Sequence, residues 1–276
     1  MVTKWTQACD KRLHKLIAYI HHTSHWTQVC HVGDEPWDCW LALFVDASFA
    51  GDLTDSKSTS GSYLCLVGPR TFVPLSWMCK KQGAISHSSS EAEVIALDAA
   101  TRMEGIPALL LWEVVLEVFP GPTTQTTNTP NPQPTSIDIS ANNIRPYQPH
   151  LHAPHDAENT FNHTFKSTSN IDYVPTNLPM SRGKALLMIF EDNEAVIKMT
   201  IKGRSPNMHH VARTHRVDLD FLFERLREDP GMFIKYVGTK EQIADIFTKG
   251  SFTAESWLSL CDLAQIGDPK RLTLPH

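Results

Sequence analysis

Four acidic residues occupy positions where a carboxylate is either costly to bury or well placed to bind a cation. Asp46 lies inside the apolar run 41–49, LALFVDASF, and a charge there is unfavourable unless it is paired or binds a cation. Glu93 lies in the first turns of a predicted helix, Asp192 follows the apolar run LLMIF, and Asp245 begins the run DIFTK. On one sheet edge they could hold two Mg²⁺ ions, which prefer carboxylate oxygen. Such a pair can activate water and stabilise the oxygen that leaves a phosphodiester.

The two glutamates of the run SSSEAE also permit a purely structural interpretation. Glu93 could be the capping-box partner of Ser90, and Glu91 could be the partner of Ser88, because a Ser followed three residues later by Glu is typical of a helix start. Taken alone, the spacing does not decide between a cap and a metal ligand.

The other three acids differ in how easily a structural role explains them. Asp192 and Asn193 could form a strand-to-helix turn with an Asx cap. Asp245 could be an ordinary solvated carboxylate on a helix. Asp46, in an apolar run that predicts a central strand, is the hardest to explain structurally.

The elements that must position these acids follow from the hydrophobic pattern. In chain order we expect a helix over 9–22, strands over 41–49, 61–68 and 70–78, helices over 88–105 and 108–119, a strand over 185–192, helices over 193–203 and 217–229, a strand over 232–238 and a helix over 240–250. A short GPR turn indicates that the second and third strands form an antiparallel hairpin. Pro107 is expected to end or kink its helix, and Trp77 is expected in the core. This order predicts an α/β fold on a mixed sheet.

Composition sets limits on the class of protein. The 276 residues carry a net charge of −5, which alone neither announces nor excludes nucleic-acid binding. The six cysteines include no C-x-x-C pair, which argues against a zinc ribbon and against a disulfide framework. The start is amphipathic and interrupted by charge, unlike a signal peptide, and no apolar run approaches the roughly 20 residues that span a bilayer. We therefore expect a soluble, reduced, intracellular protein with no membrane partner.

A second group of metal-ligand residue types has spacing that fits no standard zinc pattern: His21, His22, His25, Cys30 and His31.

The segment 120–181 is rich in Pro, Thr, Asn and His and has no periodic apolar pattern. Such a composition cannot bury enough apolar surface to offset chain ordering. We therefore expect a disordered or long surface insert, dispensable to a fold made by the flanking segments.

Several runs, taken together and in order, resemble the ribonuclease H domain of copia-type (LTR) retrotransposon Pol polyproteins. They are VDASFAGDLTDSKSTSGSYLCLVG, PLSWMCKKQGAISHSSSEAEVIALDAA, EDNEAVI, RTHRVDLDFLFERL and VGTKEQIADIFTKG. The resemblance implies a ribonuclease H-like five-stranded mixed sheet, three antiparallel then two parallel strands, flanked by helices. It divides the chain into a reverse-transcriptase connection tail and linker (1–40), a first domain part (41–119), an insert (120–184), a second domain part (185–250) and a C-terminal tail (251–276).

The resemblance also implies roles for the acids. Asp46 matches the first catalytic, metal-binding acid of the family, Asp192 the third and Asp245 the fourth. For the second acid, Glu93 is preferred to Glu91 because the E-x-x-A spacing begins at Glu93. The implied cofactors are two Mg²⁺ (or Mn²⁺) ions.

Secondary site residues follow from the same motifs. His215 matches a family histidine that could shuttle a proton near the leaving group, although a local bond near a helix start is an equal alternative. Ser60, Lys80, Lys81 and Asn193 fall in shared motifs near the substrate.

Three departures from the family pattern stand out. Phe49 replaces a tryptophan and Val94 replaces a tyrosine, and neither change removes a metal ligand. The insert is the largest departure, because the family crosses this gap in few residues.

The implied function is hydrolysis of the RNA strand of an RNA–DNA hybrid during retrotransposon reverse transcription. Selectivity would come from successive 2′-hydroxyls and from groove width. The implied partners are the hybrid and a reverse transcriptase domain of the same polyprotein, in the cytoplasm (a virus-like particle), in the nucleus or in both, and not secreted. The alternative is a degenerate or domesticated remnant that binds nucleic acid or acts as a scaffold without cutting. A strand-transfer enzyme of the integrase type is disfavoured because Glu93 precedes Asp192.

Overall fold

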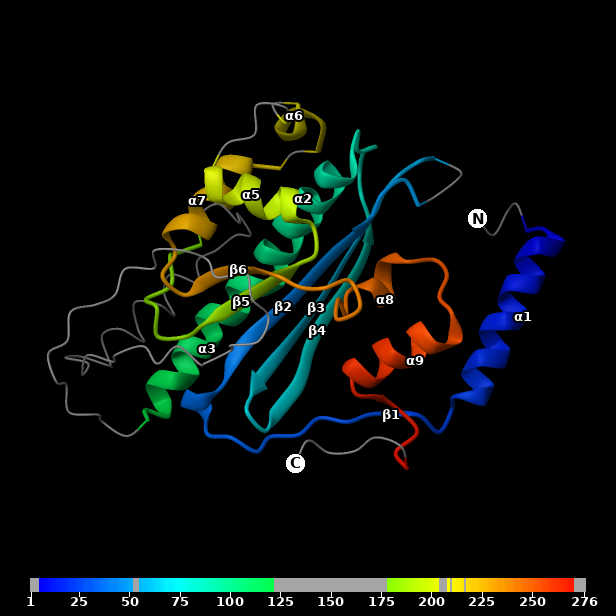
Figure 1. Ribbon diagram of the computed structural model, residues 1–276, viewed down its shortest axis with the longest axis horizontal. Helices are drawn as coiled ribbons and strands as arrows, with labels where there is room; N and C mark the ends of the chain where they lie inside the picture. Colours follow the sequence, from blue (N-terminus) through cyan, green and yellow to red (C-terminus); the bar gives the residue numbers. More distant parts are fainter. Residues whose placement is uncertain are drawn as a thin grey trace, which may run out of the picture.

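A five-stranded mixed sheet forms the centre of the computed structural model, which describes residues 5–51, 55–121, 178–203, 208, 210–215 and 217–270 (Figure 1). Its strands, in spatial order, are β4 (Thr71–Lys81), β3 (Thr59–Gly68), β2 (Trp40–Ser48), β5 (Leu187–Glu191) and β6 (Met232–Tyr236). The pairs β2–β3 and β3–β4 are antiparallel, whereas β2–β5 and β5–β6 are parallel. The predicted order of three antiparallel and then two parallel strands is confirmed.

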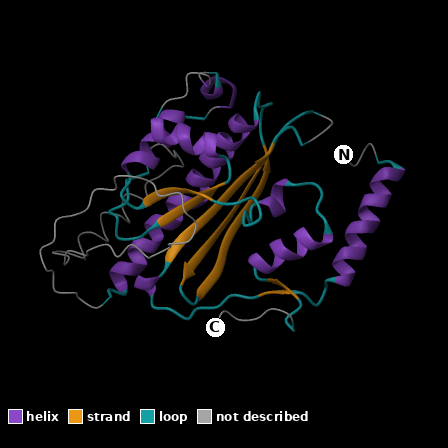
Figure 2. Cartoon of the chain, viewed as in Figure 1, coloured by secondary structure: helices purple, strands orange, loops and turns teal. Residues whose placement is uncertain are grey.

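Helices cover both faces of this sheet (Figure 2). One face packs against α2 (Ser89–Ala100), α3 (Ile106–Val118), α5 (Glu194–Lys202), α6 (Val211–His215) and α7 (Leu219–Glu228). The other packs against the segment around α8 (Asp245–Thr248) and the end of α9 (Ala254–Leu263). The central strand β2 is buried on both faces, which explains its nearly continuous apolar sequence. Within the described part of the chain, no helix combines the length and the apolar character needed to cross a bilayer.

The helices predicted on either side of Pro107 form one continuous path. A π-helical turn, η3 (Thr101–Gly105), joins α2 to α3, and the Ile106 N–H donates to the Thr101 carbonyl. Pro107 lies in the first turn of α3, directly after the π-helical turn, and its fixed φ suits a helix. A π-turn is a recognised way to absorb such an interruption. Pro107 therefore neither ends nor separates the two predicted helices.

The C-terminal part of the chain is more structured than its sequence predicted. The helix expected over 240–250 is shorter, since only α8 is helical. The expected tail contains α9, whose N-cap Thr253 accepts a hydrogen bond from the Ser256 N–H. Beyond it, β7 (Ile266–Gly267) pairs with β1 (Thr27–Gln28), which joins the predicted linker to the predicted tail. A short 3₁₀ turn, η2 (Pro36–Asp38), leads from the linker into β2.

The amino-terminal helix α1 (Gln7–His22) confirms the helix predicted over 9–22, but none of its residues is buried. It lies beside α9, and the Trp257 indole donates to the Tyr19 hydroxyl at 3.0 Å (Figure 1). Leu16 and Ile17 are each 54% exposed. Its apolar stripe is thus not part of the core formed by the described residues.

Trp77 is 58% exposed, so its expected place in the core is wrong. The residue lies on β4, the edge strand of the sheet, opposite the buried Tyr63 of β3. An edge strand lacks a neighbour on one side, and no element of the described chain covers this position. The apolar character of the residue could not reveal that difference.

The predicted insert falls largely outside the described residues, which resume at position 178. The described part of that range is attached to the core before β5 begins. Ser181 is buried and its N–H donates to Asp229 at 2.9 Å. Glu113 of α3 accepts the backbone N–H groups of Arg182 and Lys184 at 2.7 and 3.1 Å. The packed chain therefore resumes earlier than position 185.

Replacing residues 122–177 by a short Gly/Ser linker is expected to preserve folding. The chain is held on both sides: a Cβ at Gly121 would lie 2.9 Å from the Trp37 ring of η2, and Glu113 of α3 holds Arg182 and Lys184. Closure entropy grows only logarithmically with loop length, so the change alters stability by about 1–2 kcal/mol at most. Thermal unfolding of both proteins measures this, and a loss beyond that range would show that the segment belongs to the fold.

Candidate metal centre

Asp46 is held near the end of β2 by the segment that packs across the sheet. It lies opposite Gly61 of β3, where a Cβ would come within 2.6 Å of Thr248 Cγ2. The glycine therefore lets α8 approach the sheet closely. Thr248 donates a hydrogen bond from its hydroxyl to the Asp46 carboxylate, and Asp46 is only 4% exposed. This contact fixes the orientation of a buried carboxylate.

Three of the predicted acids converge. Asp46 on β2, Glu93 on α2 and Asp192 after β5 each offer a carboxylate oxygen, and these atoms all lie within 4.8 Å of one another. The parallel pairing of β2 with β5 brings Asp46 and Asp192 to one edge, and α2 packs over β2. Acids that are far apart in sequence thus form one cluster, which could hold a metal ion. We call Asp46, Glu93 and Asp192 the acid cluster.

Asp245 lies next to the acid cluster. Burial, together with the charges of Asp46 and Asp192, raises its pKa to about 6, although the hydrogen bond and charge of Lys249 oppose the shift. Lys249 Nζ contacts the Asp245 carboxylate one helical turn away. Asp245 Oδ1 is buried and has no hydrogen-bond partner among the described residues. The charges of the acid cluster therefore act on Asp245, the fourth predicted acid, and Lys249 is its ion-pair partner.

The acid cluster is strongly crowded with negative charge. Burial, together with the neighbouring carboxylates of Glu191, Asp46 and Asp192, raises the pKa of Glu93 to about 10. Burial and the charge of Asp46 also raise the pKa of Asp192. Glu93 Oε2 is buried without a hydrogen-bond partner in the described chain. A divalent cation would relieve both the repulsion and the unsatisfied oxygen.

Glu191 is a fifth buried carboxylate that the sequence interpretation missed. It is 0% exposed, its Oε1 accepts the Asn193 N–H at 3.2 Å, and its Oε2 has no partner among the described residues. Burial raises its pKa well above the usual range, with Asp192 and Asp46 adding to the effect. The signal was present, because β5 alternates and Glu191 shares its buried face with Leu187 and Ile189.

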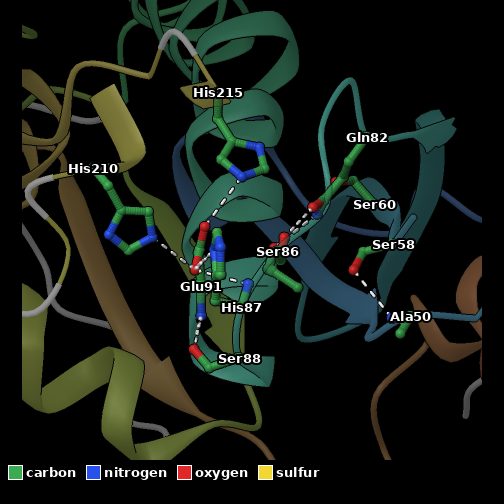
Figure 3. A network of polar contacts seen from close by, with 11 residues as sticks. Ala50, Ser58, Ser60, Gln82, Ser86, His87, Ser88, Glu91, His210 and His215 are labelled. Atoms are coloured by element: carbon green, nitrogen blue, oxygen red, sulfur yellow. Dashed lines mark hydrogen bonds and ion pairs between the residues drawn. The ribbon is translucent and has the colours of Figure 1, made fainter. Parts of the chain in front are cut away.

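The predicted substrate-binding residues lie in different surroundings. Ser60 is 3% exposed and accepts a hydrogen bond from Gln82 at 3.0 Å, so it joins the packing of β3 (Figure 3). Asn193 caps α5 by accepting the Ala195 N–H at 3.0 Å, as the structural alternative proposed. Lys80 is exposed on β4.

Lys81, the remaining predicted substrate residue, lies at the end of the same strand and contacts Asp55 at 2.8 Å. That ion pair is between partly exposed side chains, with 43% and 39% exposure. Lys80 and Lys81 thus place positive charge at one end of the edge strand β4.

His215 does not join the acid cluster. Its Nε2 lies 3.1 Å from Glu91 Oε1, and both side chains are 2% exposed (Figure 3). Glu91 also begins α2 as a structural residue: its N–H donates to the Ser88 hydroxyl, and its Oε2 accepts the His87 N–H at 2.9 Å. Proton transfer by His215 at the acid cluster is therefore supported by no contact among the described residues.

Comparisons with known proteins add no assignment. A scan against protein-family models found no matching family, and searches of curated proteins and of solved structures found no match. The chemistry of the acid cluster therefore rests on its own geometry and electrostatics.

Glu93→Gln is expected to raise the melting temperature of the metal-free protein at pH 8. The folded-state pKa of Glu93, about 10, exceeds its ordinary value of 4.5. The stability linked to this group is present below the ordinary pKa and is lost as pH rises towards the folded value. A neutral amide avoids that loss. In a chain of this size, each 1 kcal/mol in the free energy of unfolding shifts the melting temperature by about 2–4 °C.

The measurement is thermal unfolding in a chelator at pH 5 and pH 8, then with Mg²⁺. The variant should gain more at pH 8 than at pH 5, and Mg²⁺ should stabilise the wild type more than the variant. Glu224→Gln, at an exposed position of α7, is the matched control. It should change neither the melting temperature at the two pH values nor the stabilisation by Mg²⁺. A variant that is less stable than the wild type at pH 8 without metal would show that the Glu93 carboxyl group does not destabilise the folded protein.

Proposed function

We propose that this chain is a ribonuclease H-like endonuclease that hydrolyses the RNA strand of an RNA–DNA hybrid with two divalent metal ions. The observation that carries the proposal is the convergence of Asp46, Glu93 and Asp192 within 4.8 Å, with Asp245 beside them. The five-stranded sheet order and the chain order of the four acids are compatible with that fold, and the sequence motifs resemble the copia-type family.

The donor set fits Mg²⁺ or Mn²⁺. All the candidate ligand atoms are carboxylate oxygens, which hard divalent cations prefer. Asp46, Glu93 and Asp192 would hold the ions, and Asp245 would complete the set. When bound, such ions activate a water and stabilise the departing oxygen of a phosphodiester.

The surrounding residues keep these carboxylates in place. Thr248 holds the Asp46 carboxylate, and Lys249 offsets the charge of Asp245. Asn193 caps α5 directly after Asp192, which fixes the backbone at the end of β5. A site whose ligands are already oriented needs little rearrangement when substrate and metal arrive.

The substrate class follows from the resemblance and from simple chemistry. A hybrid differs from duplex DNA by its 2′-hydroxyls and its intermediate groove width, and these would select the strand that is cut. Lys80, exposed on β4, offers positive charge for a phosphate backbone. We propose that the chain works beside a reverse transcriptase domain of the same polyprotein, in a cytoplasmic virus-like particle, in the nucleus or in both.

Metal-dependent cleavage of labelled RNA in a hybrid tests the proposal. The folded full-length chain is incubated with hybrid, duplex RNA and duplex DNA, each with Mg²⁺, Mn²⁺ or a chelator. We expect cleavage of the hybrid RNA strand with either metal and none with the chelator. Hybrid binding without cleavage under both metals would instead support a non-catalytic remnant that binds or acts as a scaffold.

A further inference from the structure

A second group of metal-ligand residues surrounds Glu91, separate from the acid cluster (Figure 3). Glu91 lies in the first turn of α2, His87 lies just before that helix, and His210 and His215 come from the segment that contains α6. Figure 3 shows all three imidazoles around the one carboxylate. The group thus joins two segments that are more than a hundred residues apart in sequence.

The two distances from Glu91 to the histidines are close to those around a small tetrahedral ion. Glu91 Oε2 lies 3.2 Å from His210 Nε2 and 3.5 Å from His87 Nδ1, and one ligand atom from each of the three residues lies within 4.8 Å of the others. Zinc bonds of about 2.0–2.1 Å in a tetrahedral site place neighbouring donor atoms roughly 3.3–3.4 Å apart. A movement of the two histidines towards each other would bring all three donors to that spacing.

The orientation and exposure of the rings also suit a shared ligand. The His87 and His210 rings lie at 86° with centroids 4.9 Å apart, so neither ring stacks on the other. Their side chains are 69% and 41% exposed, which gives an ion a path from solvent. The exposed side of the group faces solvent, which could supply a water as a fourth ligand.

Two buried atoms beside the group are compatible with the same conclusion. Glu91 Oε1 and His215 Nε2 make an ion-pair contact at 3.1 Å, but neither makes a hydrogen bond in the described chain. Buried polar atoms are seldom left without a hydrogen bond. With a metal ion on Oε2, a small turn of the carboxylate would let His215 donate to Oε1, the usual arrangement around a carboxylate ligand.

The alternative is a set of ion pairs between Glu91 and protonated histidines. One carboxylate balances the charge of one imidazolium, whereas three imidazoles face Glu91 here. A divalent ion uses the neutral form of each histidine and supplies the positive charge itself. The metal interpretation therefore accounts for the surplus of histidines.

We propose that His87, Glu91 and His210 bind a first-row transition-metal ion of the zinc type, with His215 positioning the Glu91 carboxylate. Two imidazoles with one carboxylate favour such an ion, whereas the all-oxygen acid cluster favours Mg²⁺ or Mn²⁺. The bound ion fastens the first turn of α2, two residues before Glu93, to the segment that begins α6. The proposal does not depend on the proposed nuclease activity.

Zinc content measures this site directly. The full-length chain is equilibrated with Zn²⁺ in excess Mg²⁺, passed through a desalting column and analysed for zinc and protein. We expect about one Zn²⁺ per chain in the wild type and none in the double variant His87→Asn/His210→Asn. His14→Asn, which removes an exposed histidine of α1, should retain the ion, and so should Asp46→Asn.

A second measurement separates coordination from folding. Co²⁺ in a site with nitrogen ligands gives a visible absorption band, which the wild type should show and the double variant should lack, while circular dichroism of the two remains the same. His215→Asn should weaken zinc binding by about 10- to 100-fold without abolishing it. A wild type that retains no zinc, or a double variant that retains as much as the wild type, would overturn the proposal. Loss of zinc from Asp46→Asn instead would place the ion in the acid cluster and also overturn it.

Discussion

Glu93→Gln is expected to abolish cleavage of hybrid RNA, with a loss of at least about 10²–10³-fold, the size that follows removal of one key electrostatic group. Glutamine keeps the shape of the side chain but removes the charge that a metal ion requires. Glu93 lies within the acid cluster, and its Oε2 has no other partner among the described residues. The rate of cleavage at saturating Mg²⁺ measures the loss.

Glu91→Gln is the matched control, because it makes the same chemical change two residues earlier on the same helix. Glu91 contacts His87, His210 and His215 and is not part of the acid cluster. Most of the activity should therefore remain, provided that circular dichroism shows a folded protein. If Glu91→Gln abolished cleavage and Glu93→Gln did not, the assignment of the second catalytic acid would be off by two residues.

The sheet could be predicted from sequence because its strands are distinct apolar runs. Each of the five predicted strands overlaps an observed one, and the hairpin of β3 and β4 follows from the short turn between them. Local signals also place α5 well: Asn193 caps it, and Gly203 ends it with a left-handed φ of 64°. These features depend on neighbouring residues, which a sequence displays directly.

Features that depend on contacts between distant residues could not be predicted in the same way. The pairing of His210 with Glu91 joins positions that are 119 residues apart, and only the folded chain brings them together. The exposure of Trp77 depends on which strand lies at the edge of the sheet. Glu191 was overlooked because Asp192 beside it matched the expected motif, although strand alternation would have placed it in the interior.

The candidate site shows the same difference between local features, which the sequence displays, and contacts between distant residues, which it does not. The sequence identified the four acids by type, order and spacing, and the structure brings three of them within 4.8 Å. The sequence could not show that Thr248 holds Asp46, because this contact exists only when α8 crosses the sheet. Lys249 beside Asp245 is a local i, i+4 pair, which the sequence itself displays.

Asp229→Ala is expected to destabilise the protein by about 3–5 kcal/mol, because it leaves a buried cation without its partner. The side chains of Asp229 and Arg225 are 1% and 3% exposed and lie 3.1 Å apart. Asp229 also accepts hydrogen bonds from Ser181 and from the Gly231 N–H. Arg225 in turn donates to the backbone carbonyls of Leu178 and Pro179.

This pair therefore ties the chain that enters β5 to the turn that enters β6. Urea unfolding of the wild type and the variant measures the difference in the free energy of unfolding. Glu228→Ala, which removes an exposed partner of Arg227, is the matched control and should change stability by about 0–1 kcal/mol. Replacing both buried partners, Arg225→Met with Asp229→Leu, should cost less than Asp229→Ala alone, because no charge is then left unpaired. Equal losses in the single and double variants would show that the carboxylate acts through Ser181 and Gly231, and not through the arginine.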